Sequence, residues 1–406
     1  MATDFTVDRN STKWVLGSDG YLKEYAVDEP AIEFNADGSY KGVLVEPAST
    51  NEALQSEDLD NATYWDVARL TIAGDTETDP KGGTNSFLLS ETTDNDTHVF
   101  FTEAAHRPSI GSSETWTSSI FVKKGDGANA PDIVQLTYDT TTFGATQYAN
   151  FDISVGGGTS GTVTASSGGT GRIRYYGDGW YRISYTDTST SAGIAHVVLG
   201  MTNNNPTAGR LPSYAGQTDA NVFIWGAQLE ESPIATSYIP TTTGAVTRNK
   251  DDIYLTGASS LIGQTEGTLF VEVDWQLTSG TTIALLSINN DTKDNEIAIY
   301  KSSGDELRMY AESNNVEVSN QGESALAYSG IQKFAFAYKT DDFELYRNGS
   351  SISTDTSGSL ASLATLANVD FGQDAISSLQ ANMWIRAVAL YTSRLSDTQC
   401  EELTTL

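Results

Sequence analysis

The sequence predicts an all-β protein with an N-terminal hairpin segment, two β-sandwich domains and a short C-terminal helix. Three observations predict this fold class. Apolar and polar residues alternate in many short runs, which is the period of a half-buried strand. Glycine (36 residues), asparagine and aspartate separate these runs where tight turns need them. Between residues 51 and 248, no run of about eleven residues keeps the 3.6-residue period of a helix.

Residues 1–50 are predicted to form short hairpins. Turn signals at 18–20 and 35–38 punctuate strand-like runs at 13–16 and 42–45. Because the segment is too short and too rich in turns to bury a core alone, we expect it to pack on its neighbour or on another chain.

Residues 51–248 are predicted to form the first sandwich, because many short alternating strands at this spacing are typical of a sandwich or jelly roll. The predicted strands include 118–122, 133–138, 172–176, 180–185, 196–200 and 222–225. The glycine-rich stretch 156–171 fits a linker, but its interior alternates at 162–165, so a hairpin with loose ends fits equally well.

Residues 249–406 are predicted to form the second sandwich, after turn-prone residues near 238–252. Its predicted strands include 269–275, 297–300, 307–310, 333–338, 343–346 and 383–391. A single short helix is predicted at the C-terminal end. Ser396 can cap its first turn, and Gln399 stands at the capping-box position three residues later.

The formal net charge of −30 comes from 53 acidic and 23 basic residues. Such a polyanion repels phosphate backbones and anionic lipids, so we expect no nucleic-acid partner. No run approaches the roughly 18 apolar residues of a membrane span, so no membrane insertion is expected. One cysteine, Cys400, excludes an intrachain disulfide, and the first ten residues contain no signal peptide. Synthesis in a cytoplasm is therefore expected.

Three sequence blocks resemble a known module. The first spans 42–51 and continues to 59 and Tyr64-Trp65, the second is 177–182, and the third spans 222–230 and continues to 241. Together they resemble a jelly roll, similar to carbohydrate-binding modules, that recurs in bacteriophage tail fibres, spikes and head-surface proteins. The resemblance covers about residues 5–250. The second sandwich resembles laminin-G or concanavalin-like domains through 267–273, the hairpin 343–349, and the strand 384–391 that leads into 394–397.

These resemblances imply a non-enzymatic bacteriophage structural protein on the virion surface, of tail-fibre or spike type, that adheres to a host-surface glycan. Synthesis would take place in the host cytoplasm. The N-terminal segment would contact other virion proteins, and a homo-oligomer is expected, with a trimer favoured. One alternative is a capsid decoration or head-fibre protein that stabilises or coats the shell. A second alternative is a polysaccharide-degrading enzyme.

Glycan binding needs aromatic rings on which a sugar can stack, beside polar groups that hold its hydroxyls. The candidate glycan-binding residues are Trp180, Tyr181, Tyr175, Tyr176 and Trp225. Trp180 and Trp225 also stand in strand patterns, where a core position explains them better than a binding site does. The resemblance further implies structural Ca²⁺, for which Glu57, Asp58, Asp291 and Asp294 are the candidate ligands, although solvated loop carboxylates explain the same acidic residues.

The sequence contains no motif of the common catalytic classes. The three histidines, at positions 98, 106 and 196, do not have the spacing of a metal site such as H-E-x-x-H. No nucleophile elbow, phosphate-binding loop or dinucleotide fingerprint is present. With 53 acidic residues, some pair of carboxylates will lie at glycosidase spacing by chance. Such a pair therefore does not distinguish an enzyme from a binding protein. A non-enzymatic role is therefore predicted.

Overall fold

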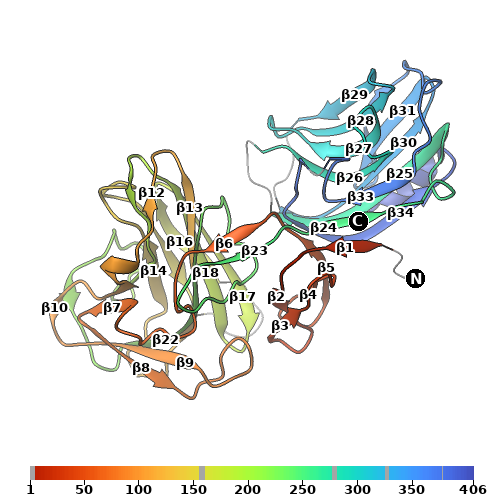
Figure 1. Ribbon diagram of the computed structural model, residues 1–406. Helices are drawn as coiled ribbons and strands as arrows, with labels where there is room; N and C mark the ends of the chain where they lie inside the picture. The colour runs from red at the N-terminus through yellow and green to blue at the C-terminus, as the bar shows by residue number, and fades with distance from the viewer. Residues whose placement is uncertain (1–4, 155–160, 277–280, 325–328, 377) are drawn as a thin grey trace.

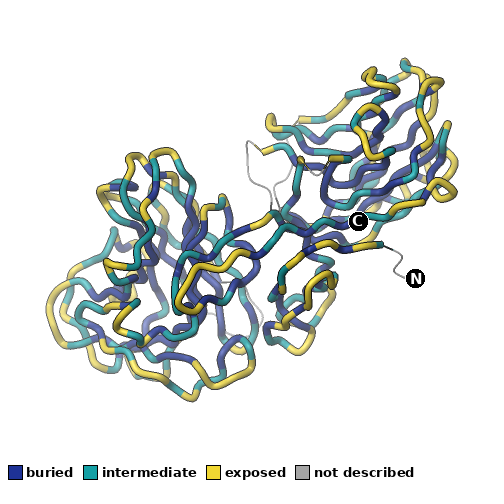
Figure 2. The backbone as a smooth tube through the Cα atoms, viewed as in Figure 1, coloured by how far each residue is buried: buried dark blue, intermediate teal, exposed yellow. Residues whose placement is uncertain are grey.

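The computed structural model describes residues 5–154, 161–276, 281–324, 329–376 and 378–406. It confirms the all-β prediction: antiparallel strands build two lobes, which lie side by side in Figure 1. Figure 2 shows that strands in both lobes are largely buried, whereas many of the connecting turns are exposed. No helix in the described part of the chain has both the length and the apolarity to cross a membrane.

The first sandwich consists of two six-stranded sheets, sheet 1 and sheet 2. Sheet 1 is formed by β16 (Thr162–Ser167), β15 (Tyr148–Asp152), β14 (Ile133–Thr137), β20 (Val198–Met201), β11 (Val99–Thr102) and β7 (Trp65–Ala68). Sheet 2 is formed by β17 (Thr170–Gly177), β18 (Trp180–Thr188), β13 (Thr115–Lys124), β22 (Asn221–Glu230), β9 (Ser86–Glu91) and β8 (Leu70–Asp75). The core between them includes Ile120, Leu136 and Phe151. Of the glycine-rich stretch, the alternating part forms strand β16, and residues 155–160 lie outside the described residues.

The second sandwich consists of two seven-stranded sheets, sheet 3 and sheet 4. Sheet 3 is formed by β1 (Thr6–Asp8), β24 (Asp252–Leu255), β33 (Asn368–Phe371), β26 (Ile283–Asn289), β27 (Asn295–Lys301), β28 (Leu307–Ser313) and β29 (Glu317–Glu323). Sheet 4 is formed by β32 (Ser350–Asp355), β31 (Asp342–Arg347), β30 (Ser329–Lys339), β25 (Glu266–Gln276), β34 (Met383–Tyr391), β5 (Tyr40–Val45) and β4 (Ile32–Phe34). Their core includes Val271, Leu286 and Phe336.

Four two-stranded ribbons and two short helices complete the described fold. The ribbons are β2 (Lys13–Leu16) with β3 (Leu22–Tyr25), β6 (Ser49–Asn51) with β23 (Val246–Arg248), β10 (Asn95–Asp96) with β21 (Tyr214–Ala215), and β12 (Ser109–Ile110) with β19 (Gly193–Ile194). The 3₁₀ helix η1 spans Ala104–His106, and the C-terminal helix α1 spans Asp397–Thr404. The predicted capping box is confirmed, because Ser396 and Gln399 bond to each other's backbone N–H groups.

The N-terminal segment, residues 1–50, forms hairpins as expected and contacts both sandwiches. Strand β1 pairs with β24 at the edge of sheet 3, and β5 pairs with β34 in sheet 4. The ribbon β2–β3 packs on the outer face of sheet 2, where Leu16 and Leu22 join an aromatic cluster of the first sandwich. The pairing partners β24 and β34 lie more than two hundred residues away in the sequence, as the pairing of Ile385 with Val43 shows.

Candidate functional site

The outer face of sheet 2 carries an aromatic cluster that contains three of the predicted glycan-binding residues. Trp180, Trp225 and Tyr176 pack there with Phe121, Phe223 and Tyr238. Leu16 and Leu22 of the N-terminal segment cover the cluster, so that Trp180 is 2% exposed and Trp225 is 1% exposed. A ring needs a free face to stack on a sugar. Burial under the β2–β3 ribbon therefore contradicts a glycan-stacking role for Trp180, Trp225 and Tyr176, and this prediction is corrected.

The two remaining candidates point the other way. Tyr181 follows Trp180 in β18 and Tyr175 precedes Tyr176 in β17, and successive side chains of a strand face opposite sides. Tyr181 is fully buried in the core between sheets 1 and 2, and Tyr175 is partly buried against that core, with its ring 5.1 Å from that of Tyr181. Tyr181 is therefore also corrected to a core residue. The five candidates do not form one site.

The predicted calcium ligands have other partners. Glu57 forms an ion pair with Lys81 at 2.5 Å, and Asp58 accepts a hydrogen bond from the Asn61 side chain at 2.8 Å. Asp291 accepts a hydrogen bond from the Asn368 side chain at 2.8 Å, and the backbone carbonyl of Asp294 accepts one from the Asn315 N–H. Within the described residues, no three His, Cys, Asp or Glu side chains gather in a way that could hold a metal ion. The structural Ca²⁺ stays a prediction.

The outer face of sheet 1 is closed by the chain itself. Gln135 and Asn150 stand on this face and are fully buried. The Gln135 side chain donates to the carbonyl of Gly209 at 3.0 Å and accepts from the N–H of Leu211 at 2.7 Å. The Asn150 side chain donates to the carbonyl of Ala208 at 2.8 Å. Because these hydrogen bonds satisfy the Gln135 and Asn150 side chains, the two side chains are not available to bind a ligand.

A cluster of buried charges joins the N-terminal segment to the chain that connects the two sandwiches. Lys13 contacts Asp251 at 2.6 Å and Glu46 at 2.9 Å, and Arg9 contacts Asp251 at 2.9 Å. Arg248 lies 3.6 Å from Glu46, and all five side chains are at most 2% exposed. Burial alone would raise the pKa of Glu46, but Lys13 and Arg248 outweigh it and lower that pKa to about 2. Glu46 is therefore ionised at neutral pH.

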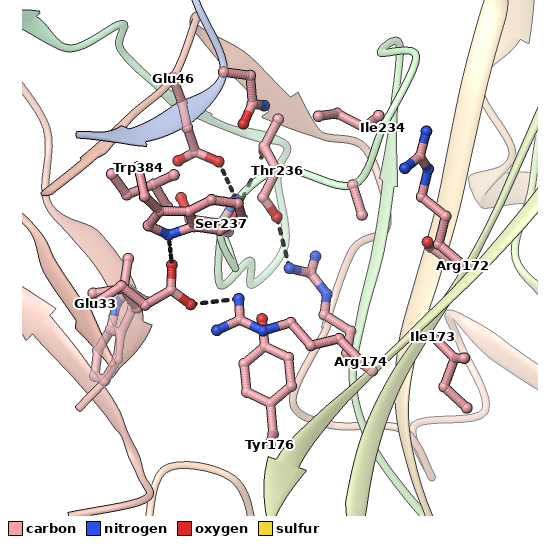
Figure 3. A pocket seen from close by; sticks show the side chains of 17 residues that line it. Glu33, Glu46, Arg172, Ile173, Arg174, Tyr176, Ile234, Thr236, Ser237 and Trp384 are labelled. Atoms are coloured by element: carbon pink, nitrogen blue, oxygen red, sulfur yellow. Dashed lines mark hydrogen bonds and ion pairs between the residues drawn. The ribbon is translucent and has the colours of Figure 1, made fainter. Parts of the chain in front are cut away.

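A second contact brings the two sandwiches and the N-terminal segment to one point. Glu33 of β4 forms an ion pair with Arg174 of β17 at 2.6 Å and accepts a hydrogen bond from the indole of Trp384, in β34, at 2.6 Å (Figure 3). Lys41 lies 4.0 Å from the centre of the Trp384 ring and pairs with Asp274 at 2.6 Å. Burial would lower the pKa of Arg174, but Glu33 outweighs it and raises that pKa.

Beside this contact lies a cavity of about 70 Å³, here called the junction cavity. Its lining comes from the N-terminal segment, from strands β17 and β18, from the stretch 234–237, and from β34 (Figure 3). Aromatic rings and hydrogen-bonding groups line it together. The residues that matter for its chemistry are Trp14, Glu33, Glu46, Arg172, Arg174, Tyr176, Arg182, Ser184, Asn382 and Trp384.

Sequence reasoning missed these arginines, although Arg172, Arg174 and Arg182 lie in strands that it predicted. The i, i+2 spacing of Arg172 and Arg174 places them on one face of a strand. The missing information was the register, in which Arg174 pairs with Arg182 and Arg172 with Ser184. The alternation of residues within one strand does not reveal which residue lies opposite on the neighbouring strand.

No protein-family model and no curated protein sequence matches the chain. Solved structures resemble parts of it. The CBM40 of the Ruminococcus gnavus IT-sialidase is 17% identical, with a TM-score of 0.32 over 37% of this chain and 88% of that chain. The binding domain of botulinum neurotoxin DC, solved with rat synaptotagmin II, is 14% identical, with a TM-score of 0.32 over 38% of this chain and 40% of that chain.

A leech intramolecular trans-sialidase is 16% identical, with a TM-score of 0.30 over 36% of this chain and 24% of that chain. The chain thus covers less than half of the neurotoxin domain and of this enzyme. At TM-scores this low, none of these likenesses supports a function for the protein.

The junction cavity combines features that suit binding of a polar ligand. Tyr176 and Trp384 are more than nine-tenths buried and supply apolar walls, while Trp14 is only partly buried. Ser184 and Asn382 add neutral hydrogen-bonding groups. Ligand sites in proteins typically combine such apolar walls with a few placed polar groups. The junction cavity is therefore the candidate functional site.

Proposed function

We propose that this chain is a non-enzymatic structural protein of a bacteriophage virion surface, of tail-fibre or spike type, and that it adheres to a host-surface glycan. The junction cavity is the observation that carries the adhesion part. Trp14 is the partly exposed ring of its wall and suits the C–H face of a sugar, and its arginine, serine and asparagine side chains suit sugar hydroxyls. The virion part rests on the sequence blocks around 42–51, 177–182 and 222–230.

The carboxylates of the junction cavity support binding over hydrolysis. A glycosidase needs one carboxyl group that donates a proton and a second that acts as base or nucleophile. Among the described lining residues, the carboxylates are Glu33 and Glu46. Glu33 is engaged by Arg174 and Trp384, and Glu46 has a pKa lowered to about 2, so it holds no proton to donate at neutral pH.

The N-terminal segment supports attachment to other virion proteins or to further copies in a trimer. It supplies β1 at the edge of sheet 3 and β4 at the edge of sheet 4. An edge strand presents unpaired backbone groups that can pair with another chain. On this proposal the protein is made in the host cytoplasm and acts on the virion surface.

The adhesion proposal is tested by measuring binding of the purified chain to a panel of isolated bacterial surface polysaccharides. We expect saturable binding to one polysaccharide class. Trp14→Ala should weaken this binding about tenfold, the loss of about 1.4 kcal/mol expected for one stacked ring. Tyr40→Ala is the matched control, because Tyr40 is 40% exposed and does not line the cavity.

Two results would contradict the proposal. Release of new reducing ends from the bound polysaccharide would show an enzyme instead of an adhesin. Electron microscopy of labelled virions that places the chain on the capsid shell would favour the capsid decoration alternative over a tail fibre or spike.

A further inference from the structure

The outer face of sheet 2 concentrates positive charge at the junction cavity. Arg172 and Arg174 stand two residues apart on β17, and Arg182 is the cross-strand partner of Arg174 on β18. All of them line the same cavity. Like charges directly opposite each other on neighbouring strands destabilise a sheet. Such an arrangement therefore needs compensating negative charge.

Among the residues that the structure describes, a carboxylate pairs with only one of these arginines. Arg174 pairs with Glu33 at 2.6 Å. Arg182 donates to neutral groups only, the carbonyl of Thr236 at 2.6 Å and the hydroxyl of Ser119 at 2.9 Å. Arg172 has no ion pair or hydrogen bond with any residue that the structure describes, and the Nε atoms of Arg172 and Arg182 are both buried without a partner.

Among the described residues, Arg107 and Arg210 also lack an ion pair but donate hydrogen bonds to neutral groups, whereas Arg172 has neither an ion pair nor a hydrogen bond. Acidic residues outnumber basic ones by 53 to 23, so a carboxylate partner is available for most surface cations. Arg182 is 6% exposed, and burial lowers the pKa of Arg172. Arg172 is partly buried, and a guanidinium partly removed from water without a counter-charge is stabilised by an anion that binds beside it.

The size of the cavity restricts the anion that fits. A volume of about 70 Å³ is several times the roughly 10 to 15 Å³ that one water needs, so the cavity accommodates a charged group of a few atoms. Guanidinium groups bind planar carboxylates through paired N–H donors. Ser184 and Asn382 are neutral neighbours that can bond the hydroxyls of the same sugar.

We propose that Arg172 and Arg182 bind the carboxylate group of an acidic sugar in the junction cavity. This inference rests on the proposed glycan adhesion and names its ligand class. The sugar ring would lie toward Trp14, the partly exposed ring of the lining, and the carboxylate would supply the charge that Arg172 and Arg182 lack.

The test uses the full-length chain and compares glucuronate with glucose, which differ at the carboxylate. Trp14 and Trp384 line the cavity, so tryptophan fluorescence reports its occupancy. At constant ionic strength, we expect a saturable change with glucuronate and none with glucose. Arg172→Gln should weaken glucuronate binding at least tenfold, and Arg172→Lys should weaken it less, because it keeps the charge and loses the paired donors.

Arg107→Gln is the matched control, since it removes the same charge from the first sandwich at a position that does not line the cavity. It should leave glucuronate binding unchanged, and circular dichroism should show that every variant is folded. Equal binding of glucose, equal binding of sulfate, or an unaltered affinity in Arg172→Gln would each overturn the inference.

The experiments distinguish a failure of the carboxylate assignment from a failure of the adhesion proposal. If the chain binds a neutral bacterial polysaccharide and Arg172→Gln has no effect, the carboxylate assignment is wrong and the adhesion proposal stands. If it binds neither polysaccharide nor glucuronate, both are wrong.

Discussion

At the residue scale, the buried Glu46 and the partly buried Asp370 lie in opposite environments. Glu46 is surrounded by cations, which lower its pKa to about 2. Asp370 of β33 lies among other carboxylates, and burial together with Asp252 and Glu296 raises its pKa to about 7. One carboxylate therefore stabilises the fold in its ionised form, whereas the other stabilises it in its protonated form.

This contrast predicts how Asp370→Asn will act. Between about pH 4 and pH 7, folded Asp370 holds a proton that the unfolded chain has lost, so the free energy of unfolding falls as pH rises through this window. Asparagine removes the charge and keeps an oxygen to accept the bond from Asn289, which is 2.5 Å away. We expect the variant to be more stable than the wild type at about pH 8, by on the order of 2 to 4 kcal/mol.

Urea unfolding at about pH 4 and about pH 8 measures this difference. The two proteins should have similar stability at the lower pH, where the side chain at position 370 is neutral in both folded proteins. If their free energies of unfolding were also equal at the higher pH, Asp370 would have an ordinary pKa in the folded protein.

At the element scale, the ribbon β2–β3 has two apolar sides. Leu16 and Leu22 pack on the aromatic cluster of the first sandwich, and Val15 and Tyr25 pack with Trp384 of the second. Alternation along each strand produces both sides, because neighbouring residues point in opposite directions. The ribbon is therefore a shared core element of the two sandwiches.

We expect Leu16→Ala to lower the free energy of unfolding by about 2 to 5 kcal/mol, the range for large-to-small changes in a packed core. Leu16 is 1% exposed, and its loss leaves a cavity against the aromatic cluster. The matched control is Val27→Ala, a truncation in the same segment at a side chain that is 47% exposed. Guanidinium unfolding, followed by tryptophan fluorescence, measures both. Equal small losses in the two variants would show that the ribbon contributes little.

The element scale also shows how far the sequence could predict the protein. Strands, turns and the capping box of Ser396 and Gln399 depend on neighbours in the sequence, and the structure confirms them. The partner of each strand depends on the whole chain. For this reason nothing local indicated that β5 pairs with β34, or that the N-terminal segment covers Trp180 and Trp225. The alternation in the strands of Trp180 and Trp225 predicted which residues share a face of the sheet, but not which segment covers that face.

The candidate site was less predictable than the fold for the same reason. Trp14, Arg172 and Trp384 come from three distant parts of the chain and meet only at the junction cavity. The sequence predicted binding by aromatic rings beside polar groups, but most of the rings that it named belong to cores of the fold. Burial decides between these two uses of an aromatic residue, and burial is a property of the tertiary structure.

At the scale of the whole molecule, the two sandwiches are coupled through residues 1–50. The apolar sides of the β2–β3 ribbon, the Glu33 contact and the buried charge cluster all lie between them. Neither sandwich keeps these contacts if the other unfolds. Contacts that both domains need make their unfolding cooperative, whereas independent domains unfold in separate steps.

We therefore expect a single calorimetric transition for the wild-type chain at neutral pH. Glu46→Gln leaves Arg9, Lys13 and Arg248 opposite Asp251 alone, and removing one partner of a buried charge cluster costs on the order of 3 to 5 kcal/mol. This variant should unfold in two resolved steps, because the lost contact lies between the sandwiches. Glu24→Gln, at an exposed position of β3, should keep one transition.

Acid should reproduce the effect of Glu46→Gln in the wild type. The pKa of Glu46 is lowered in the folded state, so its contribution is complete above about pH 4.5 and is lost as pH falls through about 2. The difference between wild type and Glu46→Gln should shrink over that range. Two transitions in the wild type at neutral pH would show that the sandwiches unfold independently and that the shared segment does not couple them.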